Sequence, residues 1–203
     1  ATGTGWETAL RCATAAAAVA VSKPGTATVS LAELRRKILP HASLAAEEKI
    51  ALSATDLDAH LAEWRERGLR VGFTNGCFDI LHLGHVDYLE KSSEFGTQMI
   101  VAVNSDASVR TLEKGVERPV NSEYARARLI AALGFVSMVI IFGESTPLEL
   151  IQALTPDVLV KGDDYTTETI VGAKEVIAAG GEVKTIALVP DYSTTKIIQK
   201  LKQ

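Results

Sequence analysis

A chain of 203 residues has room for one full domain and a short appendage. Its composition, 47% hydrophobic and 23% charged, excludes a disordered chain and a membrane-embedded one. The net charge of −4 argues against a broad nucleic-acid-binding surface, which needs clustered Lys and Arg, so any anion has to be bound locally.

Cysteine usage and the first residues bear on location. Cys12 and Cys77 are far apart and neither has a C-x-x-C partner, so we expect no disulfide framework or zinc site, and a cytoplasmic location fits best. The alanine-rich run at 13–21 resembles the apolar part of an export signal but has no basic segment before it. It is also shorter than the roughly 20 apolar residues that span a bilayer. We therefore expect no membrane partner.

The first 70 residues predict two helices separated by irregular chain. A helix is expected over 9–21, followed by a turn at 23–25 and a short β-prone stretch at 26–30. Residues 40–54 are rich in Ala, Ser and Glu without a sustained period, which favours a linker. A second helix is expected to begin near Ser53, because Ser53 and Asp56 are spaced as a capping box and apolar residues recur from Leu57 to Trp64. Gly68 should end it.

From residue 70 onward, apolar strands alternate with helices. Such a rhythm is typical of parallel βαβ units, and the runs at 100–103 and 139–142 are apolar on both faces, as in a sheet covered by helices on both sides. We therefore predict a Rossmann-like α/β domain, a three-layer doubly wound parallel sheet. The expected strands are 71–74, 99–104, 138–142, 158–161 and 183–189, and the expected helices are 85–95, 123–133, 147–154, 172–179 and 194–202.

A glycine-bearing loop follows the first of these strands and contains two of the chain's four histidines. It reads N-G-C-F-D-I-L-H-L-G-H over Asn75–His85. Gly76 permits a tight turn, and the helix that begins at His85 offers free N–H groups to a phosphate. Because His82 and His85 are three residues apart with Gly84 between them, both imidazoles can donate hydrogen bonds to one phosphate cluster. Two surface loop histidines are the alternative interpretation.

This loop resembles the H-x-G-H signature of the cytidylyltransferase-like nucleotidyltransferase superfamily. The longer string is similar to the branch of that superfamily that forms ADP-heptose. The resemblance runs from about residue 70 to residue 202, and further strings support it in the expected order. They are V-N-S-D at 103–106, R-P-V-N at 118–121 with Arg126 downstream, L-V-K-G-D-D-Y at 159–165 and S-T-T at 193–195.

The resemblance implies a reaction: D-glycero-β-D-manno-heptose 1-phosphate attacks the α-phosphorus of Mg²⁺-bound ATP, which yields ADP-heptose for lipopolysaccharide core synthesis and pyrophosphate. It also implies a homodimer, and we expect no metal ligand among the protein side chains. It implies that Arg126 faces the triphosphate or the acceptor. The implied catalytic residues are His82, His85, Lys161 and Arg126. The implied nucleotide-binding residues are Asn75, Gly76, Cys77, Phe78, Gly84, Asp164, Ser193, Thr194 and Thr195. The implied acceptor-binding residues are Asn104, Asp106, Lys114 and Arg118.

Several of these residues also have a purely structural interpretation. Ser193–Thr195 precede a helix, where they can bind an anion or simply cap the N-terminus. Lys161 ends a buried strand, where it can meet an anion or extend along apolar surface to solvent. Asp164 can cap the turn in which it lies, and Asp163 stands where the family pattern K-G-G-D-Y has a glycine.

Three more residues keep a structural alternative. Lys114 and Arg118 can be solvated loop charges, and Cys77 is most simply a small buried residue beside Phe78, not a nucleophile.

Residues 13–30 carry a second resemblance, to the closing segment of a ribokinase-type sugar kinase. The G-A-G-D segment that bears the kinase base is absent, so no kinase activity is expected. We interpret 1–40 as the remnant of such a domain, 41–54 as a linker and 55–203 as the nucleotidyltransferase domain. A truncated remnant would expose apolar helix surface, so we expect 1–40 to be poorly packed or used for association.

Two other functions fit the same sequence. The first is a cytidylyltransferase for glycerol 3-phosphate or a similar alcohol phosphate, because the H-x-G-H loop does not select the base. The second is a nucleotide-binding module without turnover.

Overall fold

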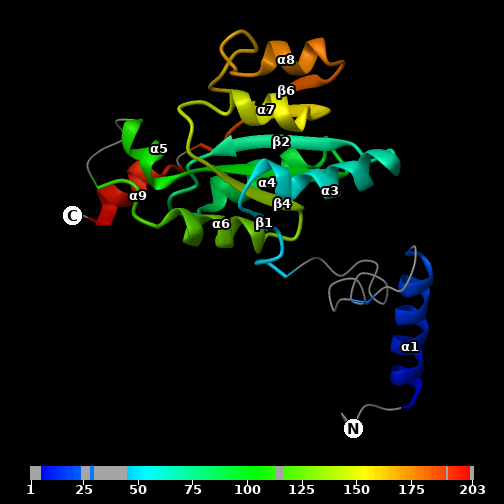
Figure 1. The fold of residues 1–203 in the computed structure, drawn as a ribbon. Helices are drawn as coiled ribbons and strands as arrows, with labels where there is room; N and C mark the ends of the chain where they lie inside the picture. Colours follow the sequence, from blue (N-terminus) through cyan, green and yellow to red (C-terminus); the bar gives the residue numbers. More distant parts are fainter. Residues whose placement is uncertain (1–5, 24–27, 30–44, 113–116, 191, 202–203) are drawn as a thin grey trace. The chain divides into compact units, whose positions relative to one another are not determined.

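The computed structural model describes residues 6–23, 28–29, 45–112, 117–190 and 192–201 (Figure 1). The chain forms two compact units, Ala1–Leu44 and Ala45–Gln203. In the first unit helix α1 spans Trp6–Val21, which confirms the predicted helix and begins it three residues earlier. Of the predicted stretch 26–30 only residues 28–29 are described, and they belong to no helix or strand, while the segment 30–44 lies outside the described residues. Among the described helices, none has the length and apolar character needed to cross a bilayer.

The second unit is built on an all-parallel sheet, as predicted, which has six strands where five were expected. The strand order is β1-β4-β3-β2-β5-β6, so the order reverses between β2 and β5. The strands are β1 (Ile50–Ala51), β2 (Val71–Gly76), β3 (Gln98–Asn104), β4 (Met138–Phe142), β5 (Val158–Gly162) and β6 (Glu182–Ile186). The helices are α3 (Ala54–Glu66), α4 (Leu83–Ser93), α5 (Asp106–Thr111), α6 (Glu123–Ala131), α7 (Leu148–Leu154), α8 (Ala173–Ala178) and α9 (Thr194–Leu201).

Helices cover both faces of the sheet, which explains why the central strands are apolar on both sides. Helices α4 and α6 pack on one face, where Leu89 and Ile130 join Val101 and Val160 in the core. On the other side, helix α7 contacts both α3 and α8 (Figure 1). Every residue from Met99 to Val103 is at most 1% exposed, so β3 is the buried centre of the unit.

The predicted helix start at Ser53 is confirmed. Ser53 is the N-cap of α3, and the Asp56 carboxylate accepts the Ser53 N–H at 2.9 Å in a capping box. Gly68 follows the C-cap with φ +65°, a conformation that glycine adopts without strain.

The predicted linker 41–54 was wrong from residue 45 onward. Residues 45–54 belong to the second unit, and Ile50 and Ala51 form the edge strand β1 beside Val139 and Ile140 of β4. Lys49 anchors this segment: it is 3% exposed, and its Nζ donates to the carbonyls of Leu133 and Val136 at 3.1 and 2.7 Å. Burial lowers the pKa of the Lys49 ammonium.

Candidate active site

A cavity of about 490 Å³ opens at the carboxyl ends of β2 and β5, where the strand order reverses. This is the place where parallel α/β sheets bind ligands, and the volume is in the range of small-molecule sites. The cavity is lined by Asn75, Gly76, Cys77, Phe78, His82, Gly84, His85, Tyr88, Arg118, Gly162, Asp164, Leu188, Val189, Tyr192, Ser193, Thr194 and Thr195. It thus brings together the loop after β2 and the start of α9.

The loop after β2 turns sharply into α4. Phe78 has φ +46°, a left-handed conformation that is uncommon for a residue other than glycine. Gly84 allows a close approach further along: a Cβ there would lie 3.0 Å from Cβ of Tyr192 and 3.2 Å from the His82 ring. The glycine therefore lets the first turn of α4 pass beside Tyr192, two residues before α9.

The two histidine rings are stacked, with centroids 3.8 Å apart and an interplanar angle of 16°. His82 is the N-cap of α4, and its Nδ1 accepts the His85 backbone N–H at 3.3 Å. An accepting Nδ1 places the proton of the neutral ring on Nε2, so this nitrogen is a donor. The His85 Nδ1 is buried and has no hydrogen-bond partner within the described part of the chain.

The surroundings of both rings favour the neutral imidazole. Burial lowers the pKa of His85 to about 4, with His82 acting in the same direction and a contact with the Ile80 backbone opposing it. Burial also lowers the pKa of His82. A triphosphate in the cavity would favour the charged imidazolium and raise both pKa values again.

Acid is expected to destabilise the domain through these rings. Between pH 6.5 and about 4 the unfolded chain binds a proton at His85 that the folded chain does not, so the free energy of unfolding falls as the pH falls through this window. Urea unfolding at pH 7, 6 and 5 measures this slope. His85→Asn should flatten it, and an unchanged slope in the variant would show that His85 does not carry the effect.

Tyr88 lines the same cavity as the histidines. Its hydroxyl lies 2.6 Å from Thr74 Oγ1 and donates to the Val160 carbonyl at 3.0 Å, so it connects α4 to β2 and β5. Burial raises the pKa of this phenol to about 12. Tyr88 lies one helical turn after His85, and that spacing is the signal by which the sequence could have indicated it.

The start of α9 also lines the cavity. The Ser193 hydroxyl accepts the Lys196 N–H at 3.2 Å and caps the helix, and Thr194 is buried. The turn after β5 accommodates Asp163 in place of the family's glycine, because its N–H donates to the Ile186 carbonyl and its carboxylate accepts the Leu188 N–H. The Asp164 carboxylate lies over Gly162, where an added Cβ would meet it at 2.5 Å.

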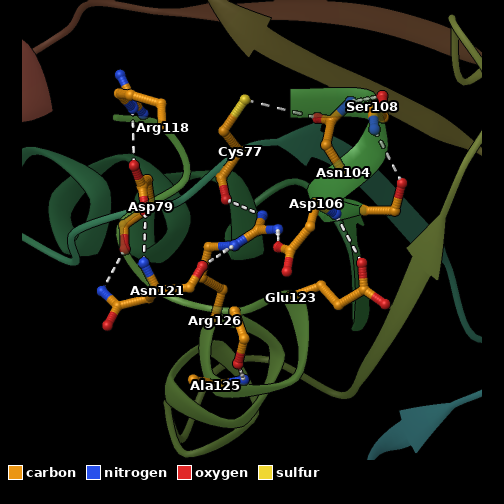
Figure 2. Close-up of polar contacts among 12 residues, drawn as sticks. Cys77, Asp79, Asn104, Asp106, Ser108, Arg118, Asn121, Glu123, Ala125 and Arg126 are labelled. Atoms are coloured by element: carbon orange, nitrogen blue, oxygen red, sulfur yellow. Dashed lines mark hydrogen bonds and ion pairs between the residues drawn. The ribbon is translucent and has the colours of Figure 1, made fainter. Parts of the chain in front are cut away.

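Arg118 lines the cavity and is held by a carboxylate that we had not assigned to the site. Asp79 is 0% exposed, and its Oδ2 accepts the Arg118 Nε–H at 2.7 Å (Figure 2). The sequence could have indicated Asp79, because it is a charged residue inside the apolar string F-D-I-L. Burying a carboxylate is costly unless it is paired.

Arg126 does not face the cavity, so the expected contact with the triphosphate or the acceptor was wrong. Its side chain is 0% exposed and donates to the Cys77 carbonyl at 2.7 Å, to the Asn121 carbonyl at 3.0 Å and to Asp106 Oδ1 at 2.7 Å (Figure 2). Arg126 therefore connects α6 to the loop after β2 and to the start of α5, and we correct its role from catalysis to positioning.

Three other predicted residues, among those that the structure describes, are not part of the cavity lining. Asn104 is buried and donates to Ser108 Oγ at 3.0 Å, and Asp106 pairs with Arg126, so we assign both a supporting role in place of acceptor binding. Lys161 lies behind the lining, and its Nζ donates to Asn75 Oδ1 at 2.5 Å and to the Asn75 carbonyl at 3.1 Å. Lys114 lies outside the described residues.

Residues 73–200 match the model of the family described as cytidylyltransferase-like. The chain belongs to this family of nucleotidyltransferases. Its curated relatives include the bifunctional protein HldE of Rhodopseudomonas palustris (strain BisB5), 60% identical over 203 residues, and that of Bradyrhizobium diazoefficiens, 58% identical over 202 residues. Each alignment covers all of this chain and 41% of the relative. The chain therefore spans about two fifths of the length of these proteins, and the kinase-like interpretation of 1–40 stays a prediction.

Solved structures agree with the cytidylyltransferase-like fold. The lipopolysaccharide core biosynthesis protein of Thermoplasma volcanium is 29% identical with a TM-score of 0.50, and the match covers 62% of this chain and all of that one. Pantothenate synthetase of Thermus thermophilus is 14% identical with a TM-score of 0.51, over 70% of this chain and 62% of the other. At that identity the second match shows the fold alone.

Proposed function

We propose that this domain transfers AMP from ATP to D-glycero-β-D-manno-heptose 1-phosphate, which gives ADP-heptose and pyrophosphate for lipopolysaccharide core synthesis. The observation that carries the proposal is the shared cavity, which is lined both by the stacked pair His82 and His85 and by the start of α9. The similarity of the loop string to the ADP-heptose-forming branch and the whole-chain identity to HldE supply the choice of substrate class.

The reaction needs no protein nucleophile. An oxygen of the sugar 1-phosphate attacks the α-phosphorus of ATP in line, the bond to the β-phosphate oxygen breaks, and pyrophosphate leaves. Catalysis then consists of positioning and of neutralising charge on the phosphorus oxygens. His82 and His85 donate to the α-phosphate, and Ser193–Thr195 with the free N–H groups of α9 bind the departing β- and γ-phosphates.

Cations complete the site around these donors. Arg118 binds the phosphate of the acceptor, and Lys114 is proposed to assist it. Lys161 holds Asn75 at the cavity wall and adds positive charge near the triphosphate.

Magnesium fits the donor set of the cavity as a companion of ATP. Within the described ranges no group of three or more His, Cys, Asp or Glu side chains converges on one point. Asp164 is a carboxylate on the lining, and Mg²⁺ usually binds through substrate phosphates, several waters and one or two carboxylates. Asp164 and the substrate phosphates would hold the ion, which would neutralise negative charge on the phosphate oxygens.

A two-by-two assay tests the proposed reaction. Pyrophosphate release is measured with ATP or CTP, each with heptose 1-phosphate or glycerol 3-phosphate, in the presence of Mg²⁺. We expect release with ATP and the heptose alone. Release with CTP and glycerol 3-phosphate would favour the cytidylyltransferase alternative, and nucleotide binding without release in any combination would favour a non-catalytic module.

Two broader expectations are part of the proposal. A homodimer follows from family analogy and is tested by light scattering on the purified chain at micromolar concentration. A cytoplasmic location is expected from the cysteine usage, because Cys12 and Cys77 are both free thiols, and fractionation of cells expressing the full-length protein tests it.

A further inference from the structure

Asp79 is a buried carboxylate that the reaction itself does not use. It lies in the loop three residues before His82 and has no exposed surface. Its two oxygens have different partners: Oδ1 accepts the N–H groups of Val120 and Asn121 at 2.8 and 3.0 Å, and Oδ2 accepts Arg118 Nε–H at 2.7 Å (Figure 2). The Asn121 side chain also donates to the Asp79 carbonyl at 2.6 Å.

These contacts join two segments that are 39 residues apart in sequence. One oxygen fixes the backbone at 120–121, and the other fixes the direction of one side chain. Arg118 has five N–H donors, and within the described part of the chain only the one on Nε is bonded to protein. Its side chain is 8% exposed and lines the cavity, so the outer edge of the guanidinium is left for an anion there.

We propose that Asp79 is a positioning residue that aims the Arg118 guanidinium at the phosphate of the acceptor. This inference rests on the proposed function, because it deepens the assignment of Arg118 as the acceptor-binding cation. A guanidinium group that a buried carboxylate holds at Nε loses little side-chain freedom when its other N–H groups bind a phosphate. Asp79 thereby also keeps Arg118 beside the loop that carries His82 and His85.

The substitution Asp79→Asn distinguishes the roles of the two carboxylate oxygens. The amide can keep an acceptor oxygen toward Val120 and Asn121, but it turns an N–H₂ group toward the donating Nε of Arg118. We expect the KM for the sugar 1-phosphate to rise about 10-fold to 100-fold, with kcat and the Kd for ATP within about threefold of the unchanged chain. Asp87→Asn is the matched control, because Asp87 is in an exposed ion pair with Lys91, and it should leave all three constants unchanged.

A double-mutant cycle with Arg118→Gln gives the decisive comparison. If Asp79 acts through Arg118, Asp79→Asn raises the acceptor KM no further in the Arg118→Gln background. If the two increases multiply, Asp79 acts through the backbone alone and the inference is overturned. Arg118→Lys provides a test with Asp79 intact, because it keeps the positive charge but not the Nε hydrogen bond. We expect its KM for the acceptor to be close to that of Arg118→Gln. A KM close to that of the unchanged chain would refute the inference.

Turnover by the chain without substitutions distinguishes a failure of this inference from a failure of the proposed function. Absence of turnover with every sugar 1-phosphate overturns the proposed function itself. Normal turnover together with multiplying effects in the cycle overturns only the role of Asp79.

Discussion

Replacing His85 with alanine is expected to lower kcat for pyrophosphate release by about 10²-fold to 10³-fold, the usual cost of removing one preorganised donor to a charged transition state. His85 lines the cavity beside His82 and its Nδ1 is buried, so water cannot simply replace its ring. A coupled assay of pyrophosphate release at saturating ATP measures the effect.

His60→Ala is the control for this substitution. His60 lies on α3, on the opposite layer from α4, and its ring contacts Trp64, so it should leave kcat within about twofold of the unchanged chain. Undiminished release by His85→Ala would mean that the imidazole does not act on the α-phosphate.

Arg126→Met is expected to lower the free energy of unfolding by about 3–5 kcal/mol, because it removes a fully buried arginine and leaves two carbonyls and a part-buried carboxylate without their donor. The Cys77 and Asn121 carbonyls lose their guanidinium donors, and Asp106 is left without its cation. Since Cys77 lies in the loop, the Kd for ATP should also rise. Urea unfolding and ATP titration measure the two effects.

Arg67→Met provides the comparison for a surface arginine. Its ion pair with Glu63 is at least half exposed, and such pairs contribute about 0–1 kcal/mol. A loss of less than about 1 kcal/mol in Arg126→Met as well would show that the buried network does not hold α6 to the loop.

The strands and helices that the sequence predicted best are those whose signal is local. The apolar run of β3 and the capping box at Ser53 depend only on neighbouring residues, and both were confirmed. Strand β1 was missed because it has two residues and is defined by pairing with Val139 and Ile140, which lie 89 positions away in sequence.

The site was predictable where a motif and the topology agree. The loop after β2 and the start of α9 were both expected to bind the nucleotide, and the cavity lining contains both. The direction of Arg126 was not predictable, since helix spacing gives the face of a residue but not what lies opposite that face. The distance between Asp79 and Arg118 is likewise a property of two loops that only the fold brings together.

A nuclear magnetic resonance titration of the histidine side chains with Mg²⁺-bound ATP tests the central claim most directly. We predict that the resonances of His82 and His85 shift together at a single Kd and that their pKa values rise in the complex, while His60 does not respond. Saturation with ATP that leaves both rings unshifted would contradict the assignment of this loop to the phosphates.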